Sequence, residues 1–126
     1  MMTPKAGGIY IIDVSEKVPY RKTKHCVCVS AGAGKYLLIN TRKCEKYDAI
    51  ILSSSNYDFL RGEDRYLEHT MVFEFSADKL VKKVGILSKD DVDALVNEII
   101  QSKTIAKADK SLMIGELGKS FMNRPH

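Results

Sequence analysis

Short apolar runs alternate with polar segments along the first part of the chain, and this pattern predicts a sheet of consecutive strands. Each run has the length of a strand and is bounded by residues that favour turns. Residues 57–68 show no clear period of apolar positions and predict a loop or a short helix. We expect strands at residues 8–14, 25–30, 36–40, 49–52 and 70–75.

The sequence Gly-Ala-Gly-Lys at residues 32–35 partly matches a phosphate-binding loop. A true loop of this kind has an earlier glycine, a Ser or Thr after the lysine, and a helix that follows. Here Val29 takes the glycine position and Tyr36 follows the lysine. Because the next residues form an apolar run, we predict a β-hairpin turn rather than a nucleotide-binding loop.

After Phe75 the apolar period changes from that of a strand to that of a helix. Ser76 is a suitable N-cap for a short helix at residues 77–84, and Gly85 is a suitable stop. The sequence therefore predicts a first short helix directly after the sheet.

A second helix is predicted from Ser88 to about Gln101. Asp91 follows Ser88 by three residues, which resembles a capping box with Asp in place of Glu. An apolar stripe at helical spacing predicts a face packed on the core, and it consists of Val92, Leu95, Val96, Ile99 and Ile100.

These elements predict an α+β fold, a small, strongly curved β-barrel or half-barrel of about five strands followed by two helices. We assign residues 1–101 to this domain and residues 102–126 to a tail. The tail contains the apolar patch Leu112-Met113-Ile114, which is compatible with a docked helix, a partner-binding arm or partial disorder.

The chain has 126 residues, which suits one domain with its own hydrophobic core. It contains no apolar run long enough to cross a bilayer and its first residues have no signal-peptide pattern, so we expect a soluble cytoplasmic protein without membrane contact. Cys26 and Cys28 share one face of a predicted strand and favour a buried apolar pair over a zinc site. We expect neither a metal nor another cofactor.

The net charge of +4 is unevenly distributed. Residues 17–46 carry eight Lys and Arg against Glu45 alone, a net charge of +7, whereas the other residues sum to −3. Such a concentration is typical of a phosphate-binding surface. The alternative is a solvated face whose lysines discourage unwanted strand pairing.

The predicted hairpin should bring the start of its first strand close to the end of its second strand. Lys24 and His25 would then lie near Asn40 and Thr41. A cationic group beside a hydroxyl suits chemistry at a phosphodiester, where protein groups stabilise the developing charge.

Two other constellations are weaker candidates. His69, together with Glu68 and Thr70, lies at the entry to the last predicted strand, where a histidine is more often structural than an acid or a base. A nucleophilic Cys28 or Cys44 paired with His25 or His69 has no support from its flanking residues.

Several short segments, taken in order, resemble the MazF/PemK family of toxin endoribonucleases. The resemblance spans residues 7–101 and consists of short matches rather than one diagnostic motif. The matching segments are the strand GGIYIID at residues 7–13, the polar loop with Arg21, CVCVS at residues 26–30, LINT at residues 38–41, and KVGILS at residues 83–88 with the helix that follows.

The resemblance implies a small SH3-like barrel, usually dimeric, that cleaves single-stranded RNA without a metal. It implies a catalytic arginine from the loop after the first strand and a Thr or Ser after the third strand. By position these are Arg21 and Thr41, and we add His25 as a third catalytic candidate. Family members commonly have Arg-Pro where this chain has Lys24-His25, and a lysine offers a point charge in place of the bidentate arginine fork.

We expect the surrounding basic and aromatic residues to bind the RNA, with tyrosines as stacking platforms. Single-stranded RNA is the expected substrate, a homodimer is the expected assembly, and an antitoxin protein is a candidate partner. The alternative is a non-catalytic module that binds nucleic acid or another protein on the same barrel. The predicted binding residues are Tyr20, Lys22, Lys24, Lys35, Arg42 and Lys43, with Tyr36 and Tyr47 as further stacking candidates. For each of these tyrosines, a position in the core or at its rim is the alternative.

Overall fold

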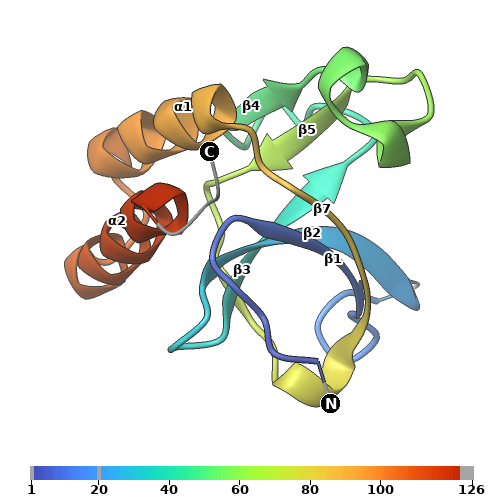
Figure 1. The fold of residues 1–126 in the computed structure, drawn as a ribbon, viewed down its shortest axis with the longest axis horizontal. Helices are drawn as coiled ribbons and strands as arrows, with labels where there is room; N and C mark the ends of the chain where they lie inside the picture. The colour runs from blue at the N-terminus through green and yellow to red at the C-terminus, as the bar shows by residue number, and fades with distance from the viewer. Residues whose placement is uncertain (1, 20, 123–126) are drawn as a thin grey trace.

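The protein is an antiparallel sheet followed by two helices (Figure 1). The computed structural model describes residues 2–19 and 21–122. The predicted α+β class is confirmed, and the strand number rises from about five to seven among the described residues. The elements are β1 (Gly8–Asp13), β2 (Thr23–Ser30), β3 (Lys35–Asn40), β4 (Ala49–Leu52), β5 (Arg65–Glu68), β6 (Phe73–Glu74), β7 (Leu80–Ile86), the helices α1 (Lys89–Gln101) and α2 (Lys107–Met122), and the single 3-10 turns η1 (Ser54–Asn56), η2 (Asp58–Leu60) and η3 (Ala77–Lys79).

The strand order is β4-β5-β3-β2-β1-β7. The short strand β6 pairs with the first part of β3, at Lys35 and Tyr36, while β5 pairs with the last part, at Ile39 and Asn40. The sheet is curved but open, because β4 and β7 form separate edges within the described part of the chain. The structure therefore supports the sheet-then-helix arrangement and does not show a closed SH3-like barrel.

Strands β2 and β3 form the predicted hairpin. Cys26 lies opposite Leu38 and Val27 lies opposite Leu37. Because neighbouring side chains of a strand point to opposite faces, this register sends alternate residues into two different cores.

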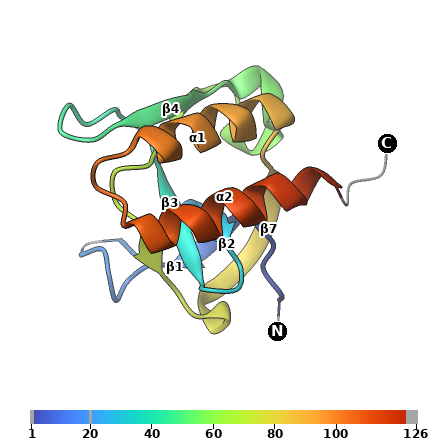
Figure 2. The ribbon, with the colours of Figure 1, turned by 90° about the vertical axis from the view of Figure 1, so that its left-hand side faces the viewer.

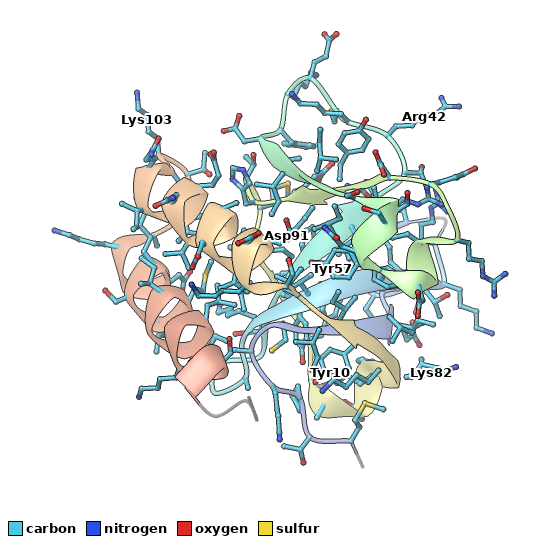
Figure 3. All side chains as sticks on the ribbon, turned by 45° about the horizontal axis from the view of Figure 1, so that its top comes forward. Tyr10, Arg42, Tyr57, Lys82, Asp91 and Lys103 are labelled. Atoms are coloured by element: carbon cyan, nitrogen blue, oxygen red, sulfur yellow. The ribbon has the colours of Figure 1, made fainter. Side chains whose placement is uncertain are left out.

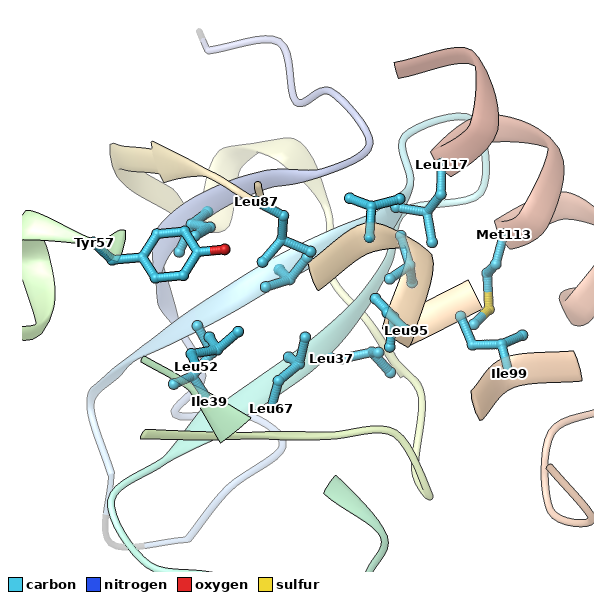
Figure 4. Packing of buried hydrophobic residues seen from close by; sticks show 14 of the residues in the cluster. Leu37, Ile39, Leu52, Tyr57, Leu67, Leu87, Leu95, Ile99, Met113 and Leu117 are labelled. Atoms are coloured by element: carbon cyan, nitrogen blue, oxygen red, sulfur yellow. The ribbon is translucent and has the colours of Figure 1, made fainter. Parts of the chain in front are cut away.

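The first core lies between the sheet and the helices (Figure 4). Leu37 and Ile39 of β3 enter it from the sheet, and Leu95 of α1 and Met113 of α2 enter it from the helices. Helices α1 and α2 lie next to each other over this face (Figure 2). The second core lies on the other face and contains Tyr10, Ile12, Val14, Cys26, Cys28, Tyr36, Leu38 and Phe75.

The N-terminus of α1 has the predicted cap. The hydroxyl of Ser88 accepts a hydrogen bond from the amide of Asp91 at 3.2 Å. The hydroxyl of Tyr57 accepts from the Ser88 amide at 2.9 Å and donates to the Asp91 carboxylate, and Figure 3 shows Tyr57 and Asp91 next to each other. Leu95 and Ile99 are fully buried as predicted, whereas Ile100 is exposed.

The prediction of a short helix at residues 77–84 is wrong. Only the 3-10 turn Ala77–Lys79 forms there, and β7 follows it directly. The β-branched residues Val81, Val84 and Ile86 favour extended backbone. Pairing with β1 also satisfies the hydrogen-bonding edge that β1 would otherwise expose, so tertiary pairing outweighs the local capping signals.

Two predictions for the segment between β4 and β7 also need correction. The expected strand at residues 70–75 shortens to Phe73–Glu74. The segment at residues 57–68, expected to be a loop or a short helix, contains the turn η2 and then β5. β5 pairs with both β3 and β4 and therefore completes the sheet between them.

The tail forms a docked helix, which is one of the three predicted alternatives. Met113 and Leu117 of α2 are fully buried in the first core. Glu116 on the same helix accepts hydrogen bonds from the amides of Ala31 (2.8 Å) and Gly32 (3.3 Å) and from the Ser30 hydroxyl. The hairpin turn is thus tied to the last helix.

We expect Gly34→Ala to lower the free energy of unfolding by about 1–3 kcal/mol, measured by urea denaturation. Gly34 has φ of +64°, and an added Cβ would lie 2.9 Å from the Phe75 carbonyl oxygen. Gly32→Ala in the same turn is the matched control, because its Cβ would meet nothing closer than Glu116 at 3.8 Å. Equal effects of the two substitutions would contradict this account of the turn.

Candidate functional site

A pocket of about 750 Å³ lies at the end of the β2–β3 hairpin that is opposite the turn. We call it the strand-end pocket. Its walls come from the start of β2, the end of β3, the loops that precede β2 and follow β3, the turn η2 and strand β5. The antiparallel register brings these segments together, as the sequence predicts.

All three predicted catalytic candidates line the strand-end pocket. Arg21 comes from the loop before β2, His25 from β2 itself, and Thr41 from the residue after β3. The predicted binding residues Lys24 and Arg42 line it as well. The hairpin therefore gathers residues as far apart in the sequence as Arg21 and Arg42.

The other predicted binding residues have different positions. Lys22 and Lys43 are exposed and do not line the pocket. Lys35 lies at the turn end of the hairpin and pairs with Glu74 at 3.3 Å. Tyr20 is outside the described residues.

The two further stacking candidates, Tyr36 and Tyr47, lie in different parts of the structure. Tyr36 is fully buried in the second core, so its prediction as a stacking platform is wrong. A tyrosine in a strand buried on both faces has no route to a ligand. Tyr47 lines the strand-end pocket and is half-buried.

The strand-end pocket is cationic. Arg65 pairs with Glu63 at 2.9 Å, but the other cationic side chains of the lining form no ion pair within the described part of the chain. A concave surface of one sign concentrates ligands of the opposite sign. The unpaired cations are Lys17, Arg21, Lys24 and Arg42.

The surroundings of Lys24 disfavour its charged form. Burial lowers the pKa of Lys24, the nearby Glu68 carboxylate raises it in part, and Arg21 lowers it again. The pKa of Lys24 is lower than usual on balance. An ammonium group of this kind releases its proton more readily than a solvated lysine does. Any anion that binds beside it stabilises its charged form.

His25 stacks on Phe59, with ring centroids 5.0 Å apart and planes at 28°. Burial lowers the pKa of His25, and the Arg65 guanidinium lowers it further. The imidazole is therefore neutral near pH 7 and able to accept a proton.

Sequence reasoning missed Phe59 and Arg65, which both line the pocket, and named Glu68, which also lines it, only together with His69. Each lies in the segment for which no clear period was found. The adjacent residues Tyr66 and Leu67 between two charged residues were the available signal for a strand. It was short, and only the pairing of β5 with Ile39 and Asn40 of β3 places that strand beside the site.

Cys26 and Cys28 lie in the second core, whereas Cys44 lines the strand-end pocket. Cys26 and Cys28 are fully buried, as expected for an apolar pair, and burial raises the pKa of each thiol to about 12. Cys28 is therefore unsuited to act as a nucleophile. Cys44 lines the strand-end pocket, and no hydrogen bond joins it to His25 in the described part of the chain.

His69 has a buried position, as expected for a structural histidine. Its side chain is 3 % exposed, and its Nε2 atom lies 3.7 Å from a carboxylate oxygen of Glu98 on α1. It lines a separate, smaller hollow with Asp48 and is not part of the strand-end pocket.

Among residues 2–19 and 21–122, no three His, Cys, Asp or Glu side chains are placed to share a metal ion. The described helices also include none with the length and apolarity to cross a membrane. No protein-family model matches the chain, and no curated protein matches its sequence significantly.

We expect Phe59→Ala to raise the pKa of His25 toward its ordinary value of about 6.5, because the stacked ring is part of what buries the imidazole. Proton titration by NMR measures this shift. A His25 pKa at or above the ordinary value in the wild type, or unchanged in the variant, would contradict the description.

The same lowered pKa makes stability depend on pH. The unfolded chain binds a proton at His25 more readily than the folded chain, so the free energy of unfolding should fall as pH drops from about 6.5 through the folded pKa. His25→Gln should remove this part of the pH dependence in urea denaturation.

Proposed function

We propose that the chain is an endoribonuclease of the MazF/PemK type, on an SH3-like sheet, that cleaves single-stranded RNA in the strand-end pocket. The observation that carries this proposal is the convergence of Arg21, His25 and Thr41 on one cationic pocket. These residues come from separate segments. The resemblance selects Arg21 and Thr41, and the hairpin register independently selects His25 and Thr41.

The charge and shape of the strand-end pocket favour an RNA backbone as the ligand. The unpaired cations would hold the phosphates, and Arg21 offers a planar fork for two phosphate oxygens. Tyr47 and Phe59 in the lining offer aromatic faces for bases. Bases can reach these faces only when they are unpaired, which favours single-stranded RNA.

The proposed reaction is an internal transfer at the phosphodiester. The ribose 2′-oxygen attacks the adjacent phosphorus while neutral His25 accepts the 2′-hydroxyl proton, and Thr41 positions this hydroxyl by hydrogen bonding. The bond from phosphorus to the 5′-oxygen breaks, and Lys24 donates a proton to that oxygen. Arg21 stabilises the extra negative charge on the phosphate oxygens. The products are a 2′,3′-cyclic phosphate and a free 5′-hydroxyl, and water exchange restores both protonation states.

A second candidate is a module that binds nucleic acid without cleaving it. It is favoured by Lys24, which stands where the family commonly has arginine and supplies a point charge without a bidentate fork. Within the described part of the chain, no hydrogen bond joins His25 to Thr41. Both candidates use the same pocket, so only the presence of cleavage separates them.

The proposal includes a homodimer, an antitoxin partner and a cytoplasmic location. Both edge strands carry exposed apolar side chains, Ile51 on β4 at 60 % and Val81 on β7 at 58 %. A second copy of the chain or a protein partner would cover such residues.

We expect the purified chain to cleave a long single-stranded RNA in EDTA. Arg21→Ala should reduce kcat/KM by about 10²–10³-fold, as loss of a transition-state donor does. His25→Ala should reduce it by about 10²–10⁴-fold, as loss of a general base does. Thr41→Val, which keeps the side-chain shape, should reduce kcat with little change in RNA binding.

Lys103→Ala is the matched control for charge, because Lys103 is exposed and lies far from Arg42 across the molecule (Figure 3). It should retain wild-type cleavage. RNA that stays intact with the wild type, while binding weakens steeply as salt rises, would contradict the nuclease and favour the binding module.

A further inference from the structure

A second pocket, of about 450 Å³, lies near the turn end of the hairpin. We call it the turn-end pocket. It is formed by the segment before β1, the end of β7, the hairpin turn at Ala31 and the last turns of α2. It shares no lining residue with the strand-end pocket, so it is a separate feature of the surface.

Three lysines from three segments line the turn-end pocket. Lys5 precedes β1, Lys83 is on β7 and Lys119 is on α2. None forms an ion pair with a carboxylate in the described part of the chain. Like charges gathered around one hollow repel one another, and a bound anion would relieve that repulsion.

Among the described residues, Glu116 is the one carboxylate of this lining, and it is already engaged by the hairpin turn. Its oxygens accept from the amides of Ala31 and Gly32 and from the hydroxyl of Ser30. Two backbone amides and a hydroxyl therefore converge on an anionic group at the rim of the pocket. The glycine-containing turn is not a nucleotide loop, but it does hold an anionic oxygen.

The remaining wall is apolar. Pro4 and Ala6 come from the N-terminal segment, and Ile86 of β7 is 47 % exposed. The volume falls within the range of about 300–1,000 Å³ that is usual for small-molecule sites. The pocket thus offers a cationic part for an anion and an apolar part for an organic group.

We propose that the turn-end pocket binds a phosphomonoester of a small organic molecule. Three lysines and one carboxylate leave an excess of two positive charges, which matches the dianionic phosphate of a monoester better than a single carboxylate. The phosphate would lie among Lys5, Lys83 and Lys119, and the organic group would lie against Ile86. This proposal does not depend on RNA cleavage in the strand-end pocket.

The test is an NMR titration of the full chain with phenyl phosphate at constant salt, followed by amide shifts. We expect saturable shifts near Ala31, Lys83 and Lys119. Lys83→Gln and Lys119→Gln should each weaken binding by about five-fold, as expected for removal of one partly solvated charge contact. Inorganic phosphate should bind more weakly than phenyl phosphate, because it has no group to contact the apolar wall.

Lys82→Gln is the matched control. Lys82 has the same charge on the same strand, but its side chain points to the other face and does not line the pocket. Figure 3 shows it on the side away from the helices. It should leave the affinity unchanged, and Glu116→Gln, which removes the competing charge, should tighten binding a few-fold.

Three results would overturn the proposal. They are shifts that grow linearly with ligand concentration, an equal loss of affinity in the Lys82 variant, or saturable shifts confined to residues of the strand-end pocket. Because the readout is ligand binding at assigned amides, its failure is independent of whether RNA is cleaved.

Discussion

Burial of the β2–β3 hairpin on both faces is the constraint on which the rest of the structure depends. Val27 and Leu37 enter the core beneath the helices, while Cys28 and Tyr36 enter the core on the other face. The hairpin is thus the wall shared by two cores. A shift of its register by one residue would exchange these two sets of side chains, so the register is strongly fixed.

The position of both pockets follows from this constraint. A hairpin buried on both faces has no place for charged side chains along its middle, because isolated buried charges are costly. The basic residues of this region therefore occur at the two ends of the hairpin and in the loops that flank it. The antiparallel pairing gathers residues from the end opposite the turn into the strand-end pocket. The turn, at the other end, faces α2 and holds Glu116 through its backbone amides.

Sequence patterns predicted the elements that depend on interactions between residues close together in the chain. The apolar runs around Cys26 and Leu38, joined by a glycine-containing turn, predicted the hairpin, and the Ser88 cap predicted the start of α1. The strand β7 was mistaken for a helix because its decisive interaction, pairing with β1, joins residues about seventy positions apart. Helix α2 was left undecided, since its burial of Met113 becomes visible only when the sheet is present.

The candidate site, like the fold, was predicted only in part from the sequence. Arg21, His25 and Thr41 were reached from the hairpin and from the family resemblance, and the structure places all three in one pocket. The role of Tyr36 could not be decided from the sequence because strand periodicity does not distinguish a stacking surface from a second core. Arg65 was missed because β5 reaches the pocket only through its pairing with β3. Phe59 was missed because no local signal places the turn η2 beside His25.

We propose that the hairpin end opposite the turn is a binding surface for RNA. Hydrogen–deuterium exchange with and without a non-cleavable single-stranded RNA tests it most directly. We predict slower exchange at residues 21–25 and 39–44 and no change at the turn, residues 31–34. Protection confined to the turn and α2, or protection nowhere in the chain at saturating RNA, would contradict the claim.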